Sequence, residues 1–115
     1  MDTFYNNYEM NFEWDSNKNA INKKKHGLSF ETATAVFADD NRIEIPDVAH
    51  SIDEERYKVI GYIGKYLSVI FTERGEYTRL ISARLATASE RKMYNDFNSE
   101  NYKCKSTSYK RTINR

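Results

Sequence analysis

Alternating apolar and polar positions in the middle of the chain predict a β-sheet. Three runs are rich in Ile, Val, Tyr and Thr, the side chains that favour strands. These runs are residues 56–63, 66–73 and 77–83. Short glycine-containing segments separate them, which favours antiparallel hairpins. Arg42–Ile45 alternates in the same way before Pro46, so the pattern predicts a four-stranded antiparallel sheet with one face to be covered.

Two helices are expected before this sheet. Asp15 suits an N-cap, because its carboxylate can accept a first-turn N–H group. Gly27 suits the end of that helix, because a residue without Cβ adopts the left-handed conformation at little cost. Ser29 then precedes an apolar helical spacing over residues 30–37. The spacing therefore predicts two short helices that meet at a tight corner.

One more helix is expected after the sheet. Thr87 and Glu90 match a capping box, in which the two side chains satisfy first-turn N–H groups reciprocally. The helix should continue to about Phe97. The predicted fold is α+β, with two N-terminal helices, a four-stranded antiparallel sheet and a C-terminal helix.

Length and composition indicate one folded domain. A chain of 115 residues can build one hydrophobic core but not two. Residues 1–11 are polar with scattered aromatics and are expected to form a flexible lead-in. Residues 12–97 are expected to form the domain. Residues 98–115 are basic and poor in apolar side chains, which is typical of a disordered tail.

Charge is balanced overall but unevenly distributed. Lys and Arg number 18 against 17 Asp and Glu, so net charge favours no class of partner. The basic segments are residues 18–25, 74–92 and those beyond 103, and the acidic segments are 31–40 and 47–55. Such separation permits an anionic polymer to bind one surface and a protein another.

Cysteine usage and hydropathy suggest the cytoplasm. The single cysteine, Cys104, cannot form an intrachain disulfide, and no cysteine-plus-histidine spacing typical of a metal site is present in the sequence. The sequence shows neither a secretory signal nor an apolar run of membrane-spanning length. We therefore expect a cytoplasmic protein with no metal, no cofactor and no membrane partner.

Four motifs follow one another along most of the chain. They are F-E-W-D-x-x-K-x-x-x-N-x-x-K-H-G-x-x-F-x-x-A at 12–33, D-E-E-R-Y-x-x-I-G at 53–61, T-E-R-G at 72–75 and R-L-I-S-A-R-x-A-T-x-x-E-R at 79–91. In order and spacing they resemble the BrnT-type toxins of bacterial type II toxin–antitoxin systems. The resemblance extends from about Phe12 to Tyr94.

The resemblance implies a RelE-like fold and a ribonuclease that cleaves RNA without a metal and inhibits translation. It also implies a ribbon-helix-helix, BrnA-like antitoxin that neutralises the toxin and contacts operator DNA through its own DNA-binding half. The tyrosine-rich sheet and uneven charge favour a protein interface, most simply in a toxin–antitoxin heterotetramer. The alternative is a non-catalytic protein- or RNA-binding module that keeps the antitoxin interface.

Arginines are the first candidates for the catalytic site. Metal-free cleavage needs cations at the phosphate, and the arginine fork grips two phosphate oxygens without losing its charge. Arg56 begins a predicted strand after an acidic segment, and the alternative is a surface ion pair with Glu54 or Glu55. Arg79 on the last predicted strand and Arg84 at its exit flank Leu-Ile-Ser-Ala, and for each a solvated strand-edge charge is the alternative.

Candidates for acid–base chemistry are fewer. His26 is the histidine inside a family motif and titrates near neutral pH, although a histidine before a terminal glycine often only caps helix carbonyls. Glu54 is a candidate general base if it faces the cleft, and the alternatives are a solvated carboxylate or one that orients an arginine. His50, in an acidic segment, is interpreted as structural or incidental.

Further cations are candidates for RNA binding. They are Lys25, Arg74 and Arg91, and for each of them a solvated surface charge is the alternative reading. The basic tail would add affinity through counterion release, or would serve only solubility. Trp14 is expected to pack in the core and not to stack on a base.

Overall fold

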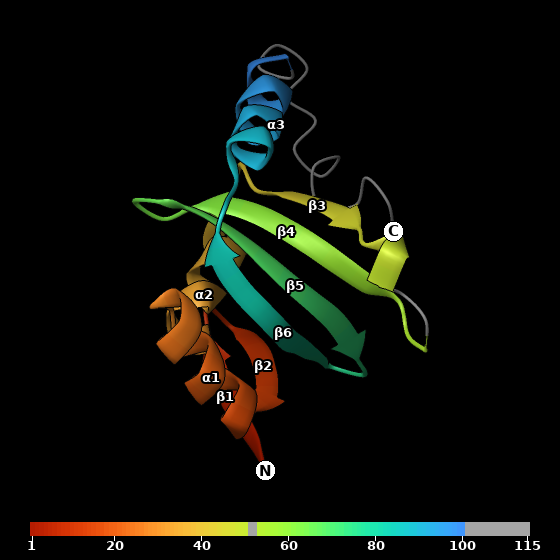
Figure 1. Ribbon diagram of the computed structural model, residues 1–115. Coiled ribbons are helices and arrows are strands. Elements are labelled where there is room, and N and C mark those ends of the chain that lie inside the picture. Colours follow the sequence, from red (N-terminus) through yellow and green to blue (C-terminus); the bar gives the residue numbers. More distant parts are fainter. Residues whose placement is uncertain (51–52, 101–115) are drawn as a thin grey trace.

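The computed structural model describes residues 1–50 and 53–100 of the chain, and a six-stranded sheet dominates it (Figure 1). The strand order is β1 (Asp2–Asn7), β2 (Met10–Asp15), β6 (Tyr77–Leu85), β5 (Tyr66–Arg74), β4 (Arg56–Tyr62) and β3 (Ile43–Pro46). The pairing of β2 with β6 is parallel, and every other pairing is antiparallel. The sheet is therefore mixed.

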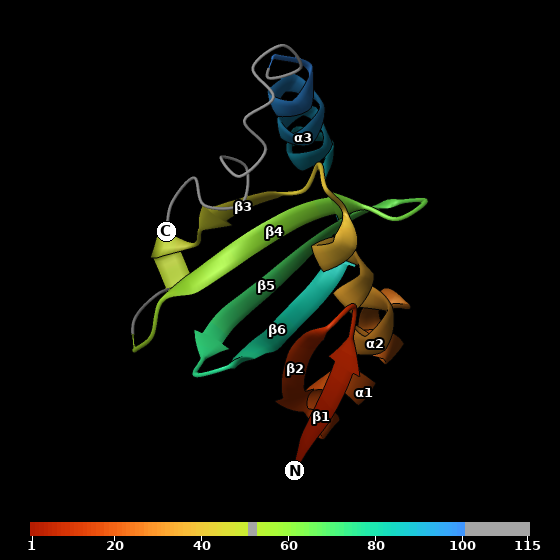
Figure 2. The same cartoon turned by 180° about the vertical axis from the view of Figure 1, so that it is seen from behind.

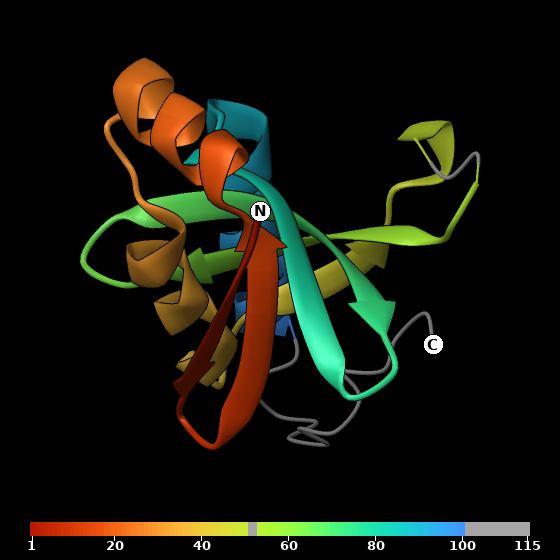
Figure 3. The ribbon, with the colours of Figure 1, turned by 90° about the horizontal axis from the view of Figure 1, so that it is seen from below.

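The predicted arrangement of two N-terminal helices and a four-stranded antiparallel sheet is wrong. The fold is α+β, but a β-hairpin precedes the helices and adds two strands. Most of this hairpin comes from the expected lead-in, residues 1–11, whose polar composition hid a strand pattern. Residues 2–7 alternate between exposed and half-buried positions, as an edge strand does. Figure 3 shows the hairpin alongside β6.

The first two helices begin where the sequence predicts. α1 (Ser16–His26) has Asp15 as its N-cap, and Gly27 ends it with φ of 72°. α2 (Phe30–Ala33) is only one turn long and continues as the 3₁₀ helix η1 (Thr34–Ala38). The expected single helix over residues 30–37 is thus an α-helical turn followed by a tighter one.

The later elements also lie close to their predicted positions. β3 to β6 match the four predicted strands within a few residues, and a short 3₁₀ helix η2 (Val48–His50) follows β3. Thr87 and Glu90 form the predicted capping box at the start of α3 (Ala88–Glu100). α3 extends three residues past Phe97. The remainder of the predicted tail, residues 101–115, lies outside the described residues.

The main core lies between one face of the sheet and the segment from α1 to η1 (Figures 1 and 2). Trp14 is fully buried there, in edge-to-face contact with Phe30 at 5.8 Å between ring centroids, so its predicted packing role is confirmed. η1 approaches β4 so closely that a Cβ on Gly61 would lie 2.8 Å from the Val36 Cβ. Glycine at this position therefore permits the contact.

A smaller core lies beneath α3, on the other side of the sheet. It contains Ile43, Ile60, Ala86 and Tyr94. Since Val59 belongs to the main core, the neighbouring strand position Ile60 points to the opposite face. No helix in the described part of the chain is both long and apolar enough to cross a membrane.

Candidate functional site

A pocket of about 280 Å³ lies on the sheet face that points away from α1 and α2. We call it the basic groove. It is lined by Asp47, Arg56, Lys58, Ile70, Ile81, Ser82 and Arg84. Three of these side chains are cationic and one is a carboxylate, so the groove suits a ligand with negative charge.

Strand alternation brings these cations together. Arg56 and Lys58 are two positions apart on β4, and Ser82 and Arg84 are two apart on β6, so each pair shares a face. Ile70 of β5 lies between the strands, opposite Lys58 on one side and Ser82 on the other. The groove therefore spans three adjacent strands.

A register shift widens the lining contributed by β6. Ile70 pairs with Ser82, whereas Phe71 pairs with Leu80, which leaves Ile81 as an extra residue on β6. An extra residue of this kind bends its strand and redirects neighbouring side chains. Both Ile81 and Ser82 consequently reach the groove.

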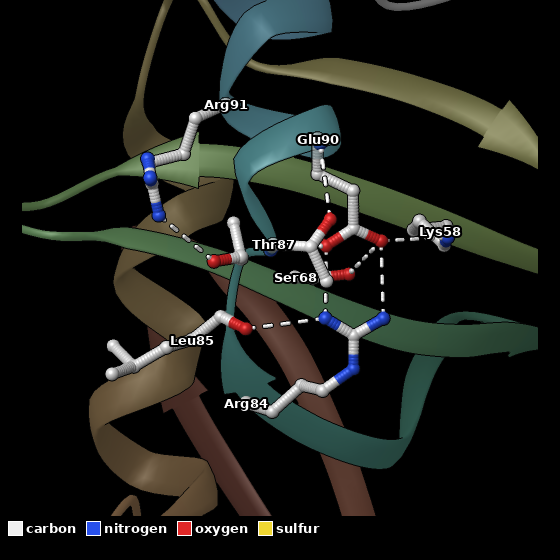
Figure 4. A network of polar contacts seen from close by, with 8 residues as sticks. Lys58, Ser68, Arg84, Leu85, Thr87, Glu90 and Arg91 are labelled. Atoms are coloured by element: carbon white, nitrogen blue, oxygen red, sulfur yellow. Dashed lines mark hydrogen bonds and ion pairs between the residues drawn. The ribbon is translucent and has the colours of Figure 1, made fainter.

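Glu90, at the start of α3, binds two of the three groove cations (Figure 4). Arg84 donates to both of its oxygens, at 2.8 and 3.0 Å, and the Lys58 Nζ donates at 2.8 Å. The Ser68 hydroxyl and the Thr87 N–H donate to the same carboxylate, at 3.3 and 2.9 Å. These five residues are called the Glu90 network below.

This network controls the ionisation of Glu90. Burial of the carboxylate would raise its pKa, but the hydrogen bonds from Arg84, Lys58 and Thr87 outweigh burial and hold the pKa well below its ordinary value of 4.5. In turn, the bond to Glu90 raises the pKa of Arg84. Glu90 and Arg84 are therefore both charged near neutral pH.

Arg79 does not line the groove with Arg56 and Arg84. Its guanidinium donates to Glu13 at 3.1 Å and to Asp2 at 3.2 Å. Partial burial would lower its pKa, but these carboxylates raise it. Arg79 thus joins β6 to the N-terminal hairpin, and its catalytic role stays a prediction.

Glu54 lies beside the groove, between two arginines. One of its oxygens is 3.7 Å from Arg56 Nη2, and the other is 3.3 Å from Arg74 Nη2. Half of the Arg74 side chain is exposed. The structure therefore places Glu54 where it can orient Arg56, and it places Arg74 at the rim of the same region.

The remaining candidates lie elsewhere. Lys25 and His26 are exposed at the end of α1, on the helix-covered side of the sheet. Arg91 lies on α3 and donates to the Ala86 carbonyl at 3.4 Å. The His50 side chain lies outside the described part of the chain. Their functional roles are not tested by this geometry and stay predictions.

Four polar residues in or beside the basic groove were missed by sequence reasoning: Asp47, Lys58, Ser82 and Glu90. Asp47 lies in a segment that was recognised only as acidic. Lys58 and Ser82 carry a detectable signal, because each lies two positions from a candidate arginine on a predicted strand. Glu90 was recognised only as a capping residue. Its contact with Lys58 joins residues 32 positions apart, and no local sequence pattern predicts such a pair.

The described residues 1–50 and 53–100 contain no group of three or more His, Cys, Asp or Glu side chains arranged to hold a metal ion.

Comparison with curated proteins gives no match. A family model described as the ribonuclease toxin BrnT of type II toxin–antitoxin systems matches residues 14–90, well over half of the chain. On this match, the chain belongs to the BrnT family of ribonuclease toxins of type II toxin–antitoxin systems.

Proposed function

We propose that this protein is an endoribonuclease that cleaves RNA without a metal ion, in the basic groove. The observation that carries the proposal is the presence of Arg56, Lys58 and Arg84 in one pocket on the face of the sheet. Cations fixed before the reaction stabilise the charge that builds on a phosphate in the transition state. Fixed donors of this type often supply the largest single part of a rate enhancement.

The reaction would be an internal transesterification of RNA. The ribose 2′-oxygen forms a bond to the adjacent phosphorus while the bond from phosphorus to the 5′-oxygen breaks. Asp47, a carboxylate of the groove, accepts the 2′-hydroxyl proton, and the leaving 5′-oxygen takes a proton from water. Arg56 contacts the phosphate, with Glu54 as its orienting partner.

Membership of a type II family implies a protein antitoxin as partner. The resemblance further supports an antitoxin of ribbon-helix-helix type in a heterotetramer, with operator DNA bound by the antitoxin. Within this proposal the antitoxin covers the basic groove, so the free toxin inhibits translation in the cytoplasm. An antitoxin can neutralise the toxin in this way because the basic groove is open and charged.

Arg56→Ala tests the groove directly, because Arg56 is outside the Glu90 network and its loss leaves those contacts in place. Purified wild type should cleave single-stranded RNA in excess EDTA. The variant should be slower by about 100-fold, from loss of a charge-stabilising donor. Lys24→Ala, an exposed cation on α1, is the matched control and should cleave like wild type.

Three outcomes would contradict parts of the proposal. Activity lost in EDTA and restored by Mg²⁺ would contradict metal independence. Full activity of Arg56→Ala would show that the basic groove is not the catalytic site. Intact RNA with folded wild type would favour the non-catalytic binding module.

A further inference from the structure

A second pocket, of about 410 Å³, lies where the β4–β5 hairpin meets the start of α3. We call it the tyrosine pocket. It is lined by Tyr62, Gly64, Lys65, Tyr66, Leu85, Ala86 and Arg91. Among these lining residues, two carry a positive charge and none is acidic. Its volume is within the range of pockets that hold small organic groups.

The tyrosines of this pocket form a fixed aromatic platform. The rings of Tyr62 and Tyr66 are 4.8 Å apart between centroids, and Tyr66 contacts Tyr94 edge to face at 5.5 Å. Asp39 holds the platform from behind, because it accepts the Tyr94 hydroxyl at 2.7 Å and the Tyr62 backbone N–H at 2.8 Å. These contacts orient the rings before any ligand arrives.

The platform is also open to a ligand. Tyr62 is 47% exposed, and the apolar side chain of Leu85 is 56% exposed. Nucleobases stack on exposed aromatic rings whatever their sequence, and nearby cations bind the phosphates between them. Lys65 and Arg91 supply those cations here. An exposed ring beside two cations therefore matches a nucleotide better than a purely apolar partner.

Tyr62 and Tyr66 of the tyrosine pocket lie on the same sheet face as the basic groove. Tyr62 is four positions after Lys58 on β4, a distance of about 13 Å along a strand. Arg84 lines the groove and the next residue, Leu85, lines the tyrosine pocket. Figure 4 shows Lys58 and Arg91 on opposite sides of the first turn of α3. Because Ile60, between Lys58 and Tyr62 on β4, is buried beneath α3, an RNA strand that occupies both pockets passes around the first turn of α3, beside Arg84 and Leu85.

We infer that the tyrosine pocket is a nucleotide-binding subsite, which stacks a base of single-stranded RNA on Tyr62 while the basic groove holds a phosphate a few nucleotides away. The inference rests on the proposed function for its substrate. Such a subsite would help to decide at which position along an RNA the protein binds.

The test measures binding of short, cleavage-resistant RNA oligonucleotides with 2′-O-methyl riboses, by fluorescence anisotropy. One nucleotide at a time is replaced by an abasic residue. In wild type, one abasic position near the groove phosphate should weaken binding about tenfold, from loss of one stacked base. In Tyr62→Leu the same abasic residue should have no further effect, because the stacking partner is already gone.

Matched variants separate stacking from damage to the fold. Tyr62→Phe keeps the ring and should bind like wild type. Tyr8→Leu replaces another exposed tyrosine, 52% exposed, in the turn between β1 and β2 at the other end of the strand order, and should show the wild-type abasic pattern. Arg91→Gln should reduce the slope of log affinity against log salt by about one unit, as the loss of one phosphate contact does.

Equal abasic penalties in wild type and Tyr62→Leu would overturn the inference. So would weaker antitoxin binding by Tyr62→Leu with unchanged RNA binding, which would identify a protein interface. Because the oligonucleotides cannot be cleaved, this result is independent of catalysis. Failure of wild type to cleave ordinary RNA would refute the proposed ribonuclease reaction and leave the binding result to decide the subsite.

Discussion

Two helices are attached to β6 through one buried polar side chain each, and the two attachments use different chemistry. Asn22 of α1 and Glu90 at the start of α3 are both only 6% exposed. The Asn22 amide accepts from the Ala83 N–H at 3.1 Å and donates to the Ala83 and Leu28 carbonyls, at 2.8 and 2.9 Å. All of its partners are backbone groups, whereas Glu90 binds two side-chain cations.

The position of Asn22 explains why a neutral amide is used. β2 pairs with β6 only at Thr78 and Arg79, so farther along the strand this edge of β6 needs another partner. At Ala83 the Asn22 side chain supplies a donor and an acceptor, as a neighbouring strand would. Such an attachment fixes the scaffold without adding charge.

Glu90 attaches α3 and also changes the charge of the groove. Its carboxylate offsets part of the positive charge on Arg84 and Lys58 while it holds both side chains in place. The comparison shows that an amide can serve stability alone, whereas a carboxylate couples stability to the electrostatics of a binding site. Substitutions at the two positions should therefore have different consequences.

The largest effect on stability is expected from Asn22→Leu. Leucine has the same branching at Cγ but is larger and carries no hydrogen-bonding group, so the N–H and C=O of Ala83 would be buried without their partner. Since each such loss costs about 1–3 kcal/mol, unfolding in urea should show a loss of about 3 kcal/mol. RNA affinity of the folded variant should be unchanged.

Asn17→Ala is the control, because it removes an exposed asparagine from the same helix. Its stability should stay near that of wild type. A loss below about 1 kcal/mol in Asn22→Leu would mean that water replaces the amide and that Asn22 is not essential to the attachment.

The difference between the two attachments also explains which parts of the fold can be predicted from sequence. The ends of α1 follow from Asp15 and Gly27, whose effects on the helix are local. The same is true of the capping box at Thr87. In contrast, β1 is polar and joins the sheet through pairing with β2, whose own place depends on parallel contact with β6. That contact joins distant segments and leaves no local pattern.

The candidate site divides in the same way. Arg56 and Arg84 belong to recognisable motifs, and the structure brings both into the basic groove. Arg79 belongs to an equally clear motif but pairs with carboxylates of the hairpin, a partner the sequence did not predict. Side-chain type therefore identifies candidates, whereas tertiary contacts decide which of them share a pocket.

A smaller loss of stability, with a gain in RNA binding, is expected from Glu90→Gln. Glutamine keeps the shape and can still accept from the Thr87 N–H, but it removes the negative charge between two cations. Arg84 and Lys58 are partly exposed, so water compensates for part of the loss and the cost should be about 2 kcal/mol. RNA affinity should rise, with a salt slope steeper by about one unit. Unchanged RNA affinity would contradict the coupling of Glu90 to the groove.

The pH dependence of stability should distinguish the two attachments as well. The folded state lowers the pKa of Glu90, so its contribution is complete above its ordinary value of 4.5 and is lost as pH falls below it. The urea concentration at the unfolding midpoint of wild type should therefore decrease as the pH is lowered from about 6 to about 3. The urea midpoint of Glu90→Gln should decrease less over that interval, whereas the curve of midpoint against pH for Asn22→Leu should run parallel to that of wild type. Parallel curves for all three proteins would rule out Glu90 as an acid-sensitive attachment.

The smallest effect is expected from Ser68→Ala, which removes the longest hydrogen bond of the Glu90 network. The Ser68 hydroxyl is 3.3 Å from the Glu90 carboxylate, and the stronger bonds from Arg84 and Lys58 remain without it. We expect a loss of about 0.5 kcal/mol in urea unfolding and unchanged RNA affinity, because the charge of the groove is the same. A loss as large as that of Glu90→Gln would show that the network holds α3 through the geometry of its hydrogen bonds, and that charge is secondary to this attachment.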